Sequence, residues 1–168
     1  ALTPLPSPPA LPADKVALGL ALFKDVRLSR DNSLSCASCH DLNGAGHDGR
    51  SVSLGVNGAR GSVNAPTVFN ASLNIAQFWD GRAATLEDQA SGPVHNPVEM
   101  ATTWPDVIAK LSADAAFRRD FLRVYPDGIS PVNIVDAIAT FERTLLTENA
   151  PFDRYLRGES NAIGERAK

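Results

Sequence analysis

The chain has 168 residues, 43% of them hydrophobic, and a formal net charge of −3. This length allows one domain with a substantial core, and the weak negative charge excludes the basic surface with which proteins bind nucleic acid or anionic membranes. No apolar run approaches the ~20 residues of a membrane-spanning helix, and the first residues lack a basic and apolar leader, so we expect a mature protein without a membrane span.

The chain begins with a proline-rich arm. Five of the first twelve residues are proline, which fixes the backbone and removes N–H donors, so residues 1–12 are predicted to form an extended or loose arm. From Asp14 onward, Val16, Leu20 and Phe23 recur at helical spacing, which predicts a helix from Asp14 to about residue 25. We expect residues 13–168 to form a single domain.

The segment Cys36-Ala37-Ser38-Cys39-His40 has the spacing of a c-type haem attachment site. Two cysteines separated by two residues can each form a thioether with one haem vinyl group, and the next imidazole then binds the iron. A thioredoxin-like pair or half of a zinc site is the alternative, but neither explains His40, and the chain has no other cysteine. We therefore predict one covalent haem c with His40 as its proximal ligand. Because c-type haem is usually attached outside the bacterial cytoplasm, we expect a periplasmic protein whose export signal has been removed.

The remaining elements are a loop and several helices. The segment Gly44–Gly61 is rich in glycine, which predicts a long functional loop passing close to a cofactor. Helix starts are predicted at Thr85, at Thr103 or Trp104, and at Ser130-Pro131. The last of these helices carries an apolar stripe that should pack on the first helix, formed by Ile134, Ile138, Phe141 and Leu145. Alternating strand patterns are scarce, so the fold class is predicted to be all-α, with long loops around a haem.

The second axial position of the iron decides between electron transfer and chemistry, because a strong protein ligand blocks substrate. The candidates are Met100, His47 and His95, the chain's lone methionine and its two histidines besides His40. Ligation by Met100 would make an electron carrier, although a lone methionine more often fills a core. The residues leave this choice open.

A second kind of site is suggested by the proline-interrupted segment that runs from Gln89 to Met100. The carboxylate of Glu99, placed over a haem, can take a proton from one oxygen of peroxide and return it to the other. The amide of Gln89 can position the peroxide and hold water. Surface glutamates are common, so these two residues alone do not establish the chemistry.

An ordered series of motifs runs along the chain: Leu28-Ser29, the haem motif, Asn64-Ala65-Pro66-Thr67, Phe78-Trp79-Asp80-Gly81-Arg82, Gln89-Ala90, Pro97-Val98-Glu99-Met100, Phe141-Glu142-Arg143-Thr144 and Pro151-Phe152-Asp153-Arg154-Tyr155-Leu156. Together these motifs resemble the bacterial dihaem cytochrome c peroxidase family, whose relatives include the dihaem enzyme that matures methylamine dehydrogenase. The resemblance runs from about residue 15 to 160 and covers only the amino-terminal, peroxidatic haem domain, which implies a class I cytochrome c-like fold. The second haem domain of the family is absent from the chain, so we expect a fragment or a separate partner chain.

The resemblance implies a role for each matching residue. His40 is the proximal ligand, Glu99 the acid/base residue and Gln89 its companion in the distal pocket. Trp79 lies on the electron route between the haems. Asn64 contributes to a calcium site at the domain interface, where an oxygen ligand suits a hard cation.

One position departs from the family pattern. Many members have a histidine in the glycine-rich loop that binds the peroxidatic iron in the resting enzyme, and that position falls on Val56, which cannot bind iron. We therefore expect a five-coordinate or water-bound haem at rest. His47 is the alternative ligand if the loop rearranges.

These observations predict the peroxidatic haem domain of a periplasmic cytochrome c peroxidase. It would reduce hydrogen peroxide to water with electrons from a donor cytochrome, a cupredoxin or the second haem domain. One alternative is an electron-transfer cytochrome c with axial ligands His40 and Met100. The other is a haem oxidase of a protein substrate, like the methylamine dehydrogenase maturation enzyme.

Overall fold

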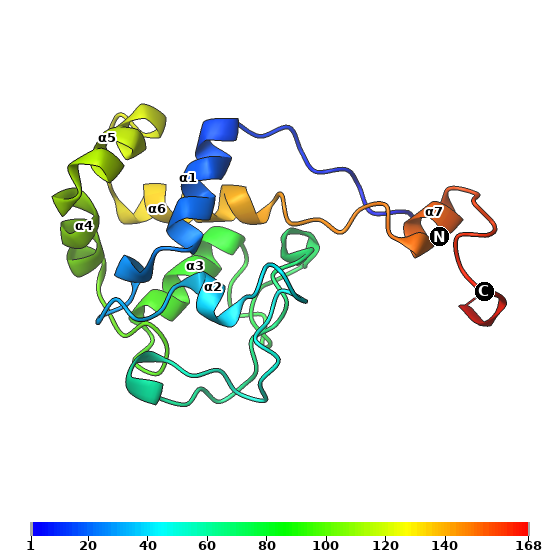
Figure 1. The fold of residues 1–168 in the computed structure, drawn as a ribbon, viewed down its shortest axis with the longest axis horizontal. Coiled ribbons are helices and arrows are strands. Elements are labelled where there is room, and N and C mark those ends of the chain that lie inside the picture. Colours follow the sequence, from blue (N-terminus) through cyan, green and yellow to red (C-terminus); the bar gives the residue numbers. More distant parts are fainter. Residues whose placement is uncertain (1, 168) are drawn as a thin grey trace.

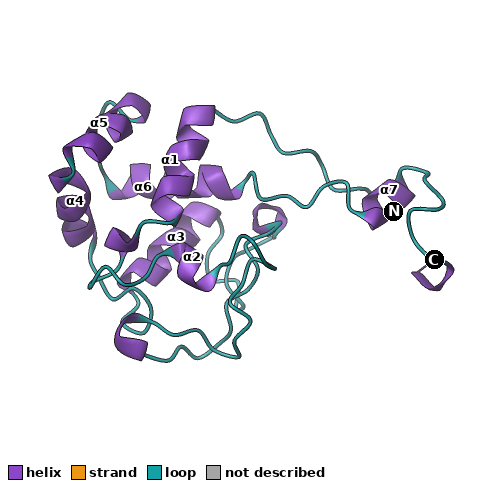
Figure 2. Ribbon diagram, in the orientation of Figure 1, coloured by secondary structure: helices purple, strands orange, loops and turns teal. Residues whose placement is uncertain are grey.

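The computed structural model describes residues 2–167, and its ribbon is helical (Figure 2). Within that range no strand forms, and the only β-type pairings are isolated bridges. Four short 3-10 turns accompany the α-helices. The predicted all-α class is confirmed. The helices are α1 (Ala13–Phe23), α2 (Cys36–Cys39), α3 (Leu86–His95), α4 (Trp104–Ala113), α5 (Ala115–Val124), α6 (Pro131–Glu142) and α7 (Pro151–Leu156).

The helices begin where side chains can satisfy their free N–H groups. The caps Thr85, Thr103 and Ser130 each accept the backbone N–H three residues further on, at the starts of α3, α4 and α6. Of the two residues predicted for the start of α4, Thr103 and not Trp104 is therefore the cap. Helix α5 was not predicted. Its cap is Asp114, whose Oδ1 accepts two backbone N–H groups, at 3.1 and 3.0 Å.

Helices α1 and α6 form the largest helix–helix contact and cross in the middle of the body (Figure 1). Ile134, Ile138 and Phe141 of the predicted stripe are buried, and the Phe141 ring lies edge-on to Phe23 with centroids 5.3 Å apart. Leu145, the last residue of the predicted stripe, lies beyond the end of α6 and is half-buried. At the crossing, a Cβ on Gly19 would overlap the carbonyl oxygen of Ala137, so only glycine allows this approach. The predicted packing of the two helices is confirmed.

The N-terminal arm runs to α7, which lies apart from the body formed by α1–α6 (Figure 1). The Leu5 N–H donates to Oδ1 of the buried Asp153 at 2.8 Å, and Oδ2 of the same carboxylate accepts the N–H of Ala150 at 3.2 Å. The arm is therefore held at its middle by α7. The predicted division of the chain at residue 12 stays a prediction.

None of the helices in residues 2–167 has the length and apolar character needed to cross a bilayer.

The α1–α6 crossing gives the first testable prediction. Gly19→Ala should lower the free energy of unfolding by about 3 kcal/mol, because the added methyl group overlaps a backbone oxygen that cannot move independently of α6. Chemical unfolding of the haem-loaded protein measures this change. Gly164→Ala is the matched control, since a Cβ there meets open space, and equal stability losses in both variants would contradict the prediction.

A candidate haem site in the central cavity

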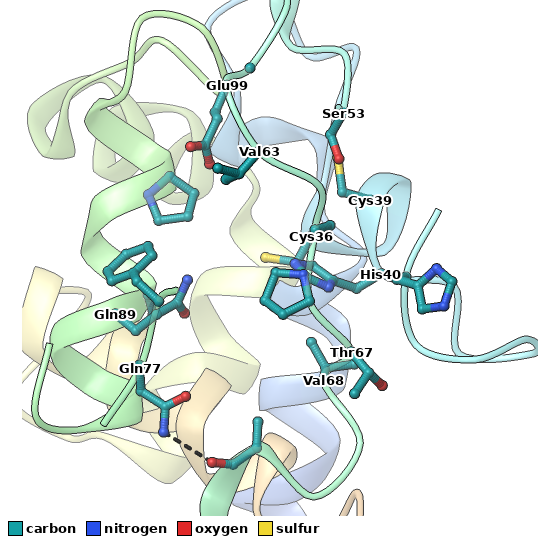
Figure 3. Close-up of a pocket in the computed structure, with 18 of the residues that line it drawn as sticks. Cys36, Cys39, His40, Ser53, Val63, Thr67, Val68, Gln77, Gln89 and Glu99 are labelled. Atoms are coloured by element: carbon teal, nitrogen blue, oxygen red, sulfur yellow. Dashed lines mark hydrogen bonds between the residues drawn. The ribbon is translucent and has the colours of Figure 1, made fainter. Parts of the chain in front are cut away.

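A cavity of about 1230 Å³ lies between α2 on one side and α3 with its following turn on the other (Figure 3). Segments far apart in the sequence meet there, including the glycine-rich loop, residues 61–82 and the end of α6. The seven residues to which the haem motif and the resemblance assign a role all line this one cavity: Cys36, Cys39, His40, Asn64, Trp79, Gln89 and Glu99. Of the three other candidate iron ligands, His47 and Met100 line it and His95 does not.

Helix α2 presents the two cysteines. Ser35 begins the turn, its N–H donates to Ser38 Oγ at 2.9 Å, and the His40 N–H closes the turn on the Cys36 carbonyl at 3.0 Å. Because one helical turn separates Cys36 and Cys39, both thiols lie on the same side. Burial raises the pKa of Cys36 to about 12, and the negative charge of Glu142 contributes a smaller part of that rise. Burial also raises the pKa of Cys39. A thioredoxin-like pair needs lowered thiol pKa values, so this alternative is disfavoured.

The imidazole of His40 is oriented by the glycine-rich loop. Its Nδ1 lies 3.1 Å from the Gly46 carbonyl oxygen, which leaves Nε2 as the ring atom available to a metal. Burial lowers the pKa of His40, partly opposed by the carbonyls of Gly46 and Pro66, and this favours the neutral ring that binds iron. Gly46 has φ +73°, and a Cβ there would press on Thr67, so the loop requires glycine at this point.

Glu99 and Gln89 face the cavity from the side opposite α2 (Figure 3). Gln89 comes from α3, and Glu99 comes from the turn that follows it. Asn96 Nδ2 donates to Glu99 Oε1 at 2.6 Å. Burial raises the pKa of Glu99, and the Asn96 hydrogen bond and the Arg82 charge oppose that rise. The cavity therefore contains a half-buried carboxyl group whose Oε1 is hydrogen-bonded by the protein.

The glycine-rich loop also supports the backbone of Glu99. The Val56 N–H donates to the Glu99 carbonyl at 2.8 Å, and the Val56 side chain is 2% exposed. A Cβ on Gly55 would overlap the carbonyl oxygen of Val98, so the loop can approach this turn only because residue 55 is glycine. The position at which the family's histidine was expected is thus occupied by a buried valine whose backbone N–H binds the Glu99 carbonyl.

The other candidate iron ligands lie in different surroundings. His47 is exposed, its Nδ1 accepts the Gly49 N–H at 2.9 Å, and it follows Gly46 on the His40 side of the site. Met100 is 5% exposed and belongs to the main hydrophobic core while also lining the cavity. The ring of His95 packs edge-on to Trp104, with centroids 5.7 Å apart.

Trp79 and Asn64 meet at the cavity surface. The Trp79 indole N–H donates to the Asn64 carbonyl at 3.0 Å, and the Trp79 side chain is 63% exposed. Among residues 2–167, no group of three or more histidine, cysteine, aspartate or glutamate side chains is placed to hold a metal ion. Calcium at Asn64 stays a prediction.

Sequence reasoning missed a buried carboxyl group. Glu142, at the end of α6, is 6% exposed and lines the cavity. Burial raises its pKa to about 7, with Arg143 lowering it and Glu87 raising it. The available signal was its position four residues after Ile138, which places a glutamate on the apolar face of a helix.

The residues around the cavity fit a covalent haem. Two thiols on one helical turn, a neutral imidazole and an apolar wall share one space, whose volume exceeds the ~300–1,000 Å³ of an ordinary ligand pocket. The apolar wall includes Leu28, Val68, Val94, Met100 and Ile138. The fold and site together define a c-type haem protein with a carboxyl group in its pocket.

Comparisons with known proteins agree with this class. The chain belongs to the di-haem cytochrome c peroxidase family, whose sequence pattern matches residues 13–161. It is 57% identical over 166 residues to the cytochrome c peroxidase Ccp of Escherichia coli (strain K12), covering 97% of this chain and 36% of that protein. It is 43% identical over 154 residues to the cytochrome c551 peroxidase of Pseudomonas aeruginosa, covering 90% of this chain and 44% of that protein.

The fold is shared with solved structures. A MauG-like protein associated with microbial copper homeostasis superimposes with a TM-score of 0.85 at 32% identity, over 98% of this chain and 51% of that one. This confirms the predicted cytochrome c-like haem domain. The chain spans about a third to a half of the length of the curated relatives named above.

The buried Glu142 gives a pH-dependent prediction. Its folded-state pKa, about 7, lies above its ordinary value of 4.5, so ionisation makes the folded state progressively less stable as the pH rises between these values. Glu142→Gln removes this penalty and should stabilise the haem-loaded protein by about 3 kcal/mol above pH ~7, and by little below pH ~4.5. Thermal unfolding at both pH values measures the difference. Glu148→Gln, on the segment between α6 and α7, is the control, and a pH-independent effect of Glu142→Gln would contradict the prediction.

Proposed function

We propose that this chain is the peroxidatic haem domain of a periplasmic cytochrome c peroxidase. It reduces hydrogen peroxide to water with electrons from an external donor. One observation carries the proposal: a half-buried carboxyl group, Glu99, lies across one cavity from a haem attachment motif. The 57% identity to a cytochrome c peroxidase supports the same activity.

The reaction consumes one hydrogen peroxide, two electrons and two protons, and gives two water molecules. Haem c, when bound through Cys36 and Cys39, supplies an iron that binds peroxide and exchanges electrons. The carboxylate of Glu99 takes a proton from one peroxide oxygen and returns it to the other, so that water leaves instead of hydroxide. The Gln89 amide orients the peroxide, and the apolar wall limits the entry of other water.

In this proposal His40 would be the one protein ligand that the described residues supply to a bound haem c, whose iron would therefore be able to bind water or peroxide at rest. The support comes from two positions: Val56 replaces the expected histidine and has no atom that binds iron, and His47 lies on the His40 side of the site. Peroxide can then bind without prior displacement of a protein ligand.

Electrons enter near Trp79. Its exposed indole at the cavity surface suits a route from a donor cytochrome, a cupredoxin or a second haem domain. Val63, which is 55% exposed and also lines the cavity, adds an apolar side chain beside Asn64 at this surface.

Oxidation of a protein substrate through Trp79 is the second candidate. It is favoured by 38% identity over 166 residues to the methylamine utilization protein MauG of Methylophilus methylotrophus. The higher identity to the Escherichia coli peroxidase makes peroxide reduction the better supported activity.

The role of Glu99 is tested by Glu99→Gln, which keeps the shape and removes the acid/base group. The kcat for peroxide reduction should fall by about 10²- to 10⁴-fold, the contribution of a positioned acid/base residue. Trp79→Phe is the comparison: peroxide cleavage in a single turnover should survive, while re-reduction by the donor slows. Unchanged peroxide cleavage in Glu99→Gln would remove the acid/base assignment.

The open axial position is tested by the ferric protein itself. Its absorption and resonance Raman spectra should show a high-spin or water-bound iron, and cyanide should bind rapidly, because no protein ligand must leave first. His47→Ala should leave both properties unchanged. A low-spin spectrum that becomes high-spin in His47→Ala would show that the loop histidine binds the iron, and a similar change in Met100→Leu would show methionine ligation.

A further inference from the structure

The two carboxylate oxygens of Glu99 are not equivalent. Oε1 accepts a hydrogen bond of 2.6 Å from Asn96 Nδ2. Within residues 2–167, Oε2 has no side-chain hydrogen-bond donor, and the residue lines the cavity. One oxygen is therefore held by the protein, while the other is available to a molecule in the cavity.

The orientation of the Asn96 amide is fixed by the turn in which it lies. Its Oδ1 accepts the Val98 N–H at 3.2 Å, and its backbone carbonyl accepts the N–H groups of Glu99 and Ala101, both at 3.0 Å. Because the amide oxygen is used by the turn, the NH₂ group must face Glu99. If the Asn96 amide were rotated by half a turn, its Oδ1 would lie against Glu99 Oε1 and its NH₂ group against the Val98 N–H.

The backbone of Glu99 is fixed independently. The Val56 N–H holds its carbonyl at 2.8 Å, and Gly55 allows the loop to lie against Val98. With the backbone held on both sides, the position of the carboxyl group depends on its side-chain torsions. Asn96 is the side chain that restrains them.

The same hydrogen bond acts on the charge of Glu99. Burial raises the pKa of this carboxyl group, and the Asn96 donor is the larger of two groups that lower it, Arg82 being the other. The Arg82 guanidinium lies over the Phe78 ring, 3.5 Å from its centroid, and also lines the cavity. A residue that must first accept a proton has to be ionised before peroxide binds, and the Asn96 donor favours that form.

We propose that Asn96 is a positioning residue for Glu99: its amide occupies Oε1, so that Oε2 is the atom that takes up and returns the proton. This inference rests on the proposed function of Glu99. It assigns to Asn96 both the orientation and the ionised state of the carboxylate.

The sharpest test is Asn96→Asp in the haem-loaded protein. Aspartate has the same shape and keeps the oxygen that accepts the Val98 N–H, but it replaces the donor to Glu99 with a second carboxylate oxygen. The pH midpoint of Glu99, followed by infrared spectroscopy without turnover, should rise by about one unit or more, because two adjacent carboxylates resist joint ionisation. The acid limb of the kcat pH profile should move in the same direction. Near neutral pH, kcat should fall by about tenfold.

Two further variants separate positioning from folding. Asn96→Ala removes both the donor and the turn acceptor, so it should raise the Glu99 midpoint less than Asn96→Asp while lowering the melting temperature more. Asn161→Asp introduces the same charge at an exposed site outside the cavity and should change neither the midpoint nor the pH profile.

The outcomes distinguish this inference from the proposed function. An unchanged Glu99 midpoint and pH profile in Asn96→Asp, with Glu99→Gln inactive, would overturn the role of Asn96 alone. Full activity of Glu99→Gln would overturn the acid/base role, while the infrared midpoint in Asn96→Asp would still report whether the hydrogen bond exists.

Discussion

The carbonyl oxygen of Gly46 is the point on which the proximal side of the cavity depends. It accepts the Val68 N–H at 3.1 Å and lies 3.1 Å from His40 Nδ1, so one atom joins the glycine-rich loop, the following segment and the proposed iron ligand. Because the imidazole is directed by this carbonyl, the loop determines where its other nitrogen lies. Displacement of the loop would therefore move the ligand as well as the wall.

The opposite side of the cavity is built by close backbone contact. Gly55 lies against Val98, and Val56 binds the carbonyl of Glu99, so the same glycine-rich loop supports both faces of the site. The half-buried Glu99 and the buried Glu142 both line the cavity but differ in their partners. Burial raises the pKa of both carboxyl groups; at Glu99 the hydrogen bond from Asn96 opposes that rise, whereas at Glu142 the charge of Arg143 does. Of these two groups, only Glu99 has a side-chain hydrogen-bond donor among residues 2–167 that holds one carboxylate oxygen, and the proposed proton exchange with a substrate rests on that difference.

The elements that the sequence predicted are those whose signals are local. Thr85, Thr103 and Ser130 were recognised as caps because a cap bonds to its own helix, and the stripe on α6 follows from helical periodicity alone. Helix α5 was missed although its signals are local too, since Asp114 caps it and Phe117, Phe121 and Val124 recur at helical spacing. Glu142 was missed as a site residue because its chemistry comes from burial, which a single sequence does not display.

The sequence by itself determined the attachment motif, the helical class and the family. Each of these depends on residue types at fixed spacing, and a helical turn is enough to bring Cys36 and Cys39 together. Only the tertiary structure decided which residues face one another. Val56 reaches the Glu99 carbonyl, Val68 reaches the Gly46 carbonyl and Glu142 enters the cavity because segments distant in the sequence pack around a shared space. Hydrogen-bond partners and burial are properties of that packing, so they become visible only when the chain is folded.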